Sequence, residues 1–181
     1  MNDTSNNGSG GIAAEAVSSR PAYFAMTFAP TLKLISVVRR FVESFYEQMI
    51  GNEDVSGMIA LATHELLENS VRYCSDDETT VRVSIGRFGN GYLISVRTRN
   101  RALPENIERV KQIIRKIGDA EDPMALYTQM MVAAATSEEG SGLGLARIRA
   151  EADMEVEYEV TGDQLEIRAT TRFETSQQEA V

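Results

Sequence analysis

The sequence is poor in the residues that build disulfides and metal centres. It contains one cysteine, Cys74, and one histidine, His64, among 181 residues. A single cysteine cannot form an internal disulfide, and neither residue belongs to a Cys/His cluster with metal-ligand spacing. These absences exclude a disulfide scaffold and a Cys/His metal site. They favour a reducing compartment, so we expect a cytoplasmic protein.

An excess of positive charge and a long hydrophobic run are also missing. The chain has 18 Lys and Arg against 27 Asp and Glu, which gives a formal net charge of −9. A basic surface over the whole fold, as nucleic-acid binding requires, is therefore not expected. Arg97, Arg99 and Arg101 alternate and could still form a local basic patch. No apolar run approaches the roughly 18 residues that span a membrane, and no secretory signal is evident.

The composition does support one folded domain. Hydrophobic residues make up 43% of the chain and charged residues 25%, as is typical of globular proteins of this size. Residues 1–20 are rich in Asn, Ser and Gly and are expected to form a flexible tail. Residues 174–181 are expected to be a short polar tail. The predicted domain therefore covers residues 21–173.

Hydrophobic periodicity predicts the order of the elements. The expected strands cover residues 23–28, 80–88, 92–98, 154–160 and 164–173, and the expected helices cover 32–50, 53–73, 104–117, 122–135 and 143–153. Gly89-Asn90-Gly91 and Gly162-Asp163 are hairpin signals. The pattern predicts an α+β fold: a two-layer α/β sandwich in which one mixed sheet carries helices on one face.

Glu65 and Asn69 form the first candidate site. They are four residues apart on a predicted helix and therefore point the same way. The amide oxygen of Asn69 can ligate Mg²⁺, and the carboxylate of Glu65 can orient or deprotonate a hydroxyl group. A solvated polar helix face gives the same pattern, so this pair alone does not define a function. Glu68 is expected to be a solvated neighbour, and His64 a structural or surface residue.

A glycine loop before a helix is the second candidate site. The loop places Gly140, Ser141, Gly142, Leu143 and Gly144 at the start of the helix predicted over residues 143–153. Glycine allows close backbone approach, and amide groups at a helix N-terminus bind phosphate. A plain turn is the alternative. A dinucleotide-binding loop is disfavoured because that motif follows the first strand of a βαβ unit. Arg147, one turn later, either reaches a phosphate or is exposed.

Taken together, the Asn-bearing helix, the hairpin, the helical segment and GSGLGL resemble the GHKL ATPase superfamily. The likeness spans roughly residues 22–173. Glu65 and Asn69 match its N-box, and Gly140, Gly142 and Gly144 match its second glycine box. The resemblance implies a Bergerat fold that binds ATP and Mg²⁺, with Glu65 as the general base and Asn69 holding the metal. It also implies a lid over about residues 101–139.

The first glycine box of that superfamily, D-x-G-x-G, has no counterpart here. Residues 96–104 contain neither Asp nor Gly. Asn100 is the expected adenine contact because its side-chain oxygen is also an acceptor, and Thr98 is the other candidate. A neutral acceptor binds more weakly than a carboxylate.

Within the superfamily, the front of the chain is similar to the anti-sigma-factor serine kinases. The lid and the region of Asn100 are similar to the SiaB-like branch, whose members phosphorylate a STAS-domain partner. The resemblance therefore implies a serine/threonine protein kinase or switch acting on a STAS-domain antagonist-like partner, and a homodimer. One alternative is a non-catalytic module that sequesters a sigma factor or another regulator. Another is a catalytic domain that phosphorylates a histidine in a separate chain.

Overall fold

The computed structural model describes residues 22–135 and 142–174. The predicted tail over residues 1–20 lies outside the described residues, as do residues 175–181 of the second predicted tail. Residues 136–141 also lie outside them, and this segment includes Gly140 and Ser141 of the glycine loop.

The chain folds in the predicted order of elements. These are β1 (Ala22–Phe28), α1 (Leu32–Ile50), α2 (Glu53–Tyr73), β2 (Cys74–Phe88), β3 (Gly91–Ala102), α3 (Pro104–Gly118), α4 (Pro123–Ala134), α5 (Leu143–Glu151), β4 (Glu155–Thr161) and β5 (Gln164–Glu174). Strands β2 and β3 are longer than predicted. Their additional residues are mostly polar or charged, so hydrophobic alternation does not reveal them.

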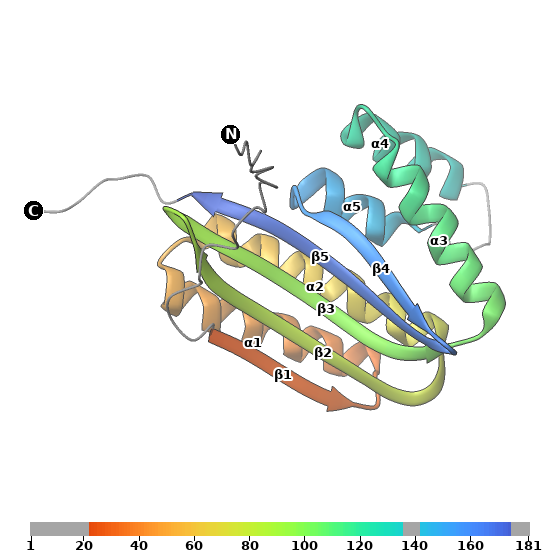
Figure 1. Cartoon of the computed structure of the whole chain (residues 1–181), viewed down its shortest axis with the longest axis horizontal. Helices are drawn as coiled ribbons and strands as arrows, with labels where there is room; N and C mark the ends of the chain where they lie inside the picture. Colours follow the sequence, from red (N-terminus) through yellow and green to blue (C-terminus); the bar gives the residue numbers. More distant parts are fainter. Residues whose placement is uncertain (1–21, 136–141, 175–181) are drawn as a thin grey trace, which may run out of the picture.

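The five described strands form one sheet in the order β1-β2-β3-β5-β4. Every neighbouring pair is antiparallel. The predicted mixed sheet is thus corrected to an antiparallel one. The reason is that hairpins join β2 to β3 and β4 to β5, and the chain returns through α3–α5 so that β5 runs against β3. The helices cover one face of the sheet, which confirms the predicted two-layer α+β architecture (Figure 1).

Local signals fix the ends of several helices. Asn52 caps α2, because its side chain accepts a hydrogen bond from the amide of Val55 at 3.0 Å. Gly51 ends α1 in the left-handed conformation, with φ of 68°. Pro104 and Pro123 open α3 and α4, where the missing N–H costs nothing.

The core lies between α1, α2 and the sheet. Ile35, Val42, Leu66 and Val83 are completely buried there. Tyr46 is also buried, and its hydroxyl donates a hydrogen bond to the carbonyl oxygen of Val83 at 3.0 Å. Helix α2 packs on β2, β3 and β5 and contacts both α1 and α5. This central position allows one face of α2 to meet the start of α5. No helix within residues 22–135 and 142–174 is long and apolar enough to cross a membrane.

Candidate functional site

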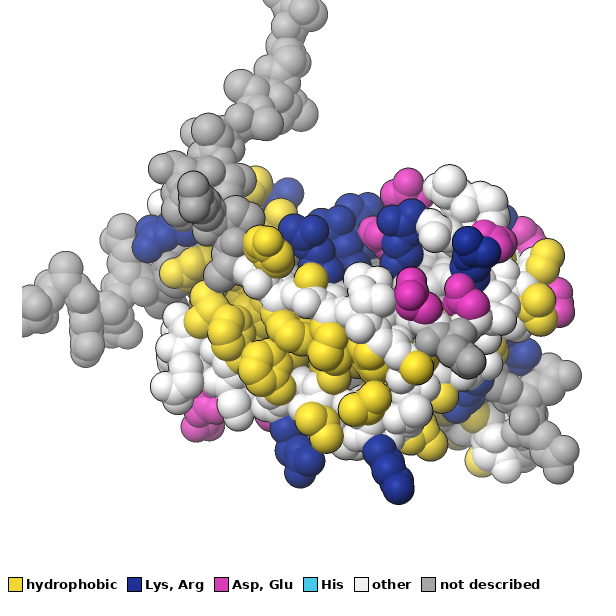
Figure 2. Space-filling view, turned by 90° about the horizontal axis from the view of Figure 1, so that it is seen from below, with side chains coloured by type: hydrophobic (Ala, Val, Ile, Leu, Met, Phe, Trp, Pro, Cys, Tyr) yellow, Lys and Arg dark blue, Asp and Glu magenta, His cyan; other side chains and the backbone are white. Residues whose placement is uncertain are grey.

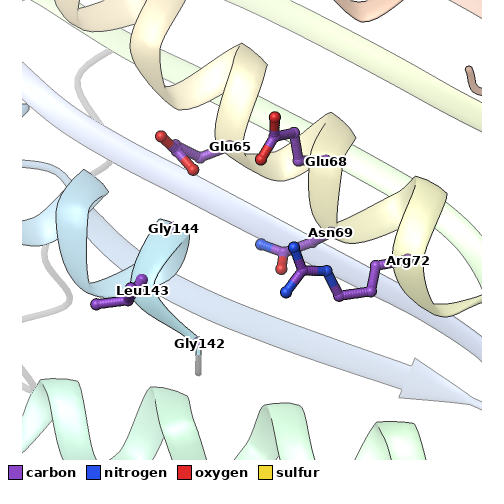
Figure 3. Close-up of a pocket in the computed structure, with 7 residues that line it drawn as sticks. All are labelled: Glu65, Glu68, Asn69, Arg72, Gly142, Leu143 and Gly144. Atoms are coloured by element: carbon purple, nitrogen blue, oxygen red, sulfur yellow. The ribbon is translucent and has the colours of Figure 1, made fainter. Parts of the chain in front are cut away.

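A cavity of about 210 Å³ lies between α2 and the start of α5 (Figure 3). Helix α2 contributes Glu65, Glu68, Asn69 and Arg72, and the start of α5 contributes Gly142, Leu143 and Gly144. The four α2 residues are spaced i, i+3, i+4 and i+7, so the helix presents them on a single face. The fold therefore brings the two candidate motifs together, although more than 70 residues separate them.

Glu65 is a buried carboxylate with a defined partner. Its residue exposure is 7%, and its Oε1 accepts a hydrogen bond from Nη1 of Arg147 at 3.0 Å. Nε of Arg147 donates to Oε2 of Glu151 at 2.8 Å. The bond to Glu151, with a smaller contribution from Glu65, raises the pKa of Arg147. Arg147 therefore stays positively charged and compensates the buried charge of Glu65.

The close packing around Gly142 and Gly144 leaves little room for a Cβ atom. A Cβ atom on Gly144 would lie 2.5 Å from Oε2 of Glu65. A Cβ atom on Gly142 would lie 2.6 Å from the side chain of Ile113 in α3, and Gly142 also has a positive φ of 66°. The alternating glycines therefore let the start of α5 approach α2 and α3 at the same point.

Asn69 points into the cavity (Figure 3). Its Nδ2 atom is buried and has no hydrogen-bond partner among the described residues. Buried side-chain nitrogens in folded proteins nearly always have a partner, so the unpaired amide suits a ligand atom in the cavity. Gly142, at the N-cap position of α5, has no side chain that could cap the helix, and the N-terminus of α5 lies at the same cavity.

Two further charged residues line the cavity. Arg72 is exposed on the last turn of α2, and Glu68 contacts Nε2 of His64 at 3.2 Å. The sequence interpretation did not include Arg72, although its spacing from Glu65 and Asn69 was a signal that could have identified it. His64 is half-buried and lies outside the cavity lining, as expected of a structural residue.

Asn100 lies in β3, on the helix-covered face of the sheet, and is 8% exposed. Its Oδ1 accepts a hydrogen bond from Oγ of Ser70 at 3.3 Å, and its Nδ2 donates to the carbonyl of Arg101 at 2.9 Å. It is not among the residues that line the cavity at Asn69. Thr98 lies on the same face, and its buried Oγ1 has no partner among the described residues. The adenine contact assigned to Asn100 stays a prediction.

The segment predicted as a lid begins with Arg101 and Ala102, which the structure places at the end of β3. Residues 104–134 form α3 and α4 with the turn between them, and α4 packs on α5. Movement of this segment over a ligand stays a prediction.

The cavity is small for a ligand site. Its volume lies below the roughly 300–1,000 Å³ of typical ligand sites. Arg72 and the start of α5 supply positive potential for phosphate. Within the described residues no cluster of three His, Cys, Asp or Glu side chains could hold a metal ion. Mg²⁺ at Asn69 would therefore share its coordination with phosphate oxygens, as is usual for this ion.

No family model matches the sequence, and no curated protein matches it. Among solved structures, the chain is similar to one chain in the crystal structure of the SiaB–SiaC complex from Pseudomonas aeruginosa. The TM-score is 0.61 at 14% sequence identity, over 82% of this chain and 88% of the other. This likeness establishes a shared fold over most of both chains.

Proposed function

We propose that this chain is a SiaB-like regulatory protein kinase that transfers phosphate from ATP to a serine or threonine of a STAS-domain partner. The observation that carries the proposal is the cavity at which Glu65 and Asn69, whose Nδ2 has no partner among the described residues, meet the start of α5. The fold shared with a chain of the SiaB–SiaC complex supports it.

The residues of the cavity divide into three roles. Glu65 accepts the proton of the partner's hydroxyl group as that oxygen bonds to the γ-phosphorus and the bond to the β-phosphate oxygen breaks, releasing ADP. Asn69 provides an oxygen ligand for Mg²⁺, which neutralises charge on the phosphates. The positive end of the α5 dipole and the guanidinium of Arg72 attract and hold phosphate oxygens.

Two measurements test the proposal: calorimetry with ATP and Mg²⁺, and transfer of labelled phosphate to a purified STAS-domain partner. We expect Glu65→Gln to lower the transfer rate about 10²–10⁴-fold while leaving ATP affinity within about twofold. Asn69→Ala should weaken Mg²⁺-dependent ATP binding. The matched control is Glu47→Gln on α1, remote from the cavity, which should match wild type. Equal transfer by wild type and Glu65→Gln would refute the kinase proposal, and acid-labile phosphate on the product would indicate phosphohistidine.

A non-catalytic module that sequesters a sigma factor or another regulator is the second candidate. The observation that favours it is that two side chains predicted to act on the nucleotide or substrate are already bonded to other residues of the protein. Oε1 of Glu65 binds Arg147, and the acceptor oxygen of Asn100 binds Ser70. A clear micromolar heat signal with ATP and Mg²⁺ would count against a nucleotide-free module.

We also propose that the chain forms a homodimer through α1 and β1. Leu34, Val37, Phe41, Phe45 and Met49 are exposed at helical spacing along α1. The ring of Phe41 contacts Phe24 in β1, which is an edge strand. Figure 2 shows the resulting hydrophobic band on the α1–β1 side of the molecule. A continuous apolar band of this kind is typical of an interface, and an unpaired edge strand can pair with a second copy.

A further inference from the structure

The face of the sheet opposite the helices carries a row of arginines. Arg82 in β2 lies directly opposite Arg97 in β3, and Arg97 lies directly opposite Arg168 in β5. Neighbouring strands are about 4.8 Å apart, so the three side chains share a strip about 10 Å long. No described helix covers this face (Figure 1).

The row is unfavourable for the isolated fold. Like charges directly opposite each other in a sheet are destabilising. The compensation within the chain is partial: Arg97 is 3.8 Å from Glu166, and Arg168 is 3.2 Å from Glu157. The Nε atom of Arg168 is buried without a partner among the described residues. Arg82 lies over the ring of Tyr23 at 4.7 Å and has no carboxylate partner in the part of the chain that the structure describes.

Further arginines extend the row along the strands. By alternation, the same face of β2, β3 and β5 carries Arg82, Arg97, Arg99, Arg101, Arg168 and Arg172. Glu166 is the acidic residue in the middle of this set, and the glutamates of β4 lie along one edge. At one end lie Glu78 and two carboxylates that pair with Arg101, Asp76 and Asp163, each at 3.6 Å. Figure 2 shows Lys and Arg side chains along the upper rim, on the side of the open face.

We propose that this arginine face is a docking surface for an acidic segment of a partner protein. Guanidinium groups pair with carboxylates in a bidentate, charge-assisted geometry, and a carboxylate-bearing segment across the row would relieve the repulsion. The exposed side chain of Leu93 adds an apolar contact on the same face. A long nucleic acid fits less well, because the chain has a net charge of −9 and acidic β4 borders the row. The surface is distinct from the cavity at Asn69, so this proposal does not depend on the kinase proposal.

The test measures the binding of a fluorescein-labelled oligoglutamate peptide to the full chain by fluorescence anisotropy. We expect Arg97→Gln to weaken binding about tenfold, the loss of one charge-assisted contact. We expect the double variant Arg97→Gln/Arg168→Gln to weaken it further. The matched control is Arg39→Gln/Arg40→Gln, which removes two exposed arginines of α1 and should stay within about twofold of wild type.

The melting temperature gives a second readout, because removal of repulsion stabilises the fold. We expect Arg97→Gln to melt about 1–4 °C higher than wild type. If Arg97→Gln does not fold, Arg82→Gln at one end of the row serves the same test. Unchanged peptide affinity in the folded row variants would overturn the proposal, as would a lower melting temperature. Single-stranded DNA that binds as tightly as the peptide and loses affinity with the same variants would also overturn it, in favour of a general polyanion surface.

Discussion

The contact between Gly144 and Glu65 leads to a sharp prediction about stability. Replacing a glycine with alanine inside a helix stabilises it by up to about 1 kcal/mol, because alanine loses less backbone entropy. At Gly144 that gain is opposed by the new Cβ, which would lie 2.5 Å from Oε2 of Glu65. Oε2 is the far end of the side chain and can shift, but Glu65 is buried and a shift would disturb the bond that its Oε1 accepts from Arg147. Overpacking of this kind costs about 1–3 kcal/mol.

We therefore expect Gly144→Ala to be destabilised by about 0–2 kcal/mol, measured by urea or thermal unfolding. Gly57→Ala is the matched control, because Gly57 lies inside α2 and a Cβ there meets nothing within 4 Å. The control should gain up to about 1 kcal/mol, which raises the melting temperature by about 2–4 °C.

Making Gly144→Ala in a Glu65→Ala protein shows whether contact with Glu65 causes the loss of stability. Glu65→Ala removes the carboxylate that the new methyl group would meet, so Gly144→Ala should become neutral or stabilising in this background. Equal stabilisation by Gly144→Ala and Gly57→Ala in the wild-type background would refute the reasoning. It would mean that the start of α5 does not press against Glu65.

Three further predictions follow from individual contacts. A double-mutant cycle with Glu65→Gln and Arg147→Met should give a coupling free energy of about 0.5–1 kcal/mol. This value is small because Arg147 is partly exposed and solvent screens the ion pair. Additive effects of the two substitutions would exclude the ion pair. Burial raises the pKa of Tyr46 to about 12, above its ordinary value of 10.0. Because the neutral phenol is favoured in the folded state, its contribution to the free energy of unfolding is present below pH 10 and is lost as pH rises toward 12. Alkaline unfolding should therefore be less steep in Tyr46→Phe, and an identical pH dependence in both proteins would contradict this. Phe41→Asp should convert a dimer to a monomer in light scattering, whereas Val132→Asp on exposed α4 should not; a wild-type monomer would refute the dimer proposal.

Much of the fold was predictable because the signals are local. The period of the apolar residues indicated the bounds of α1 and α2, and Gly51 and Asn52 marked the end of α1 and the start of α2. The strand directions were not predictable in the same way, because pairing depends on where the chain returns after α3–α5. The expected mixed sheet was therefore wrong, although the two layers were correct.

The candidate site was likewise predictable from the sequence only in part. Spacing along one helix placed Glu65 and Asn69 on a common face, and would also have included Arg72. No spacing rule indicates that Arg147 pairs with Glu65, or that Asn100 bonds to Ser70, since both contacts join distant segments.

The sequence by itself therefore determined the helices, the strands and the two motifs, because propensity, capping and periodicity act over a few residues. Only the tertiary structure decided that Gly144 lies against Glu65 and that Nδ2 of Asn69, in a cavity, has no partner among the described residues. It also decided that Arg82, Arg97 and Arg168 stand in one row across three strands. Register and packing between distant segments set these relations, and they arise only once the whole core has closed.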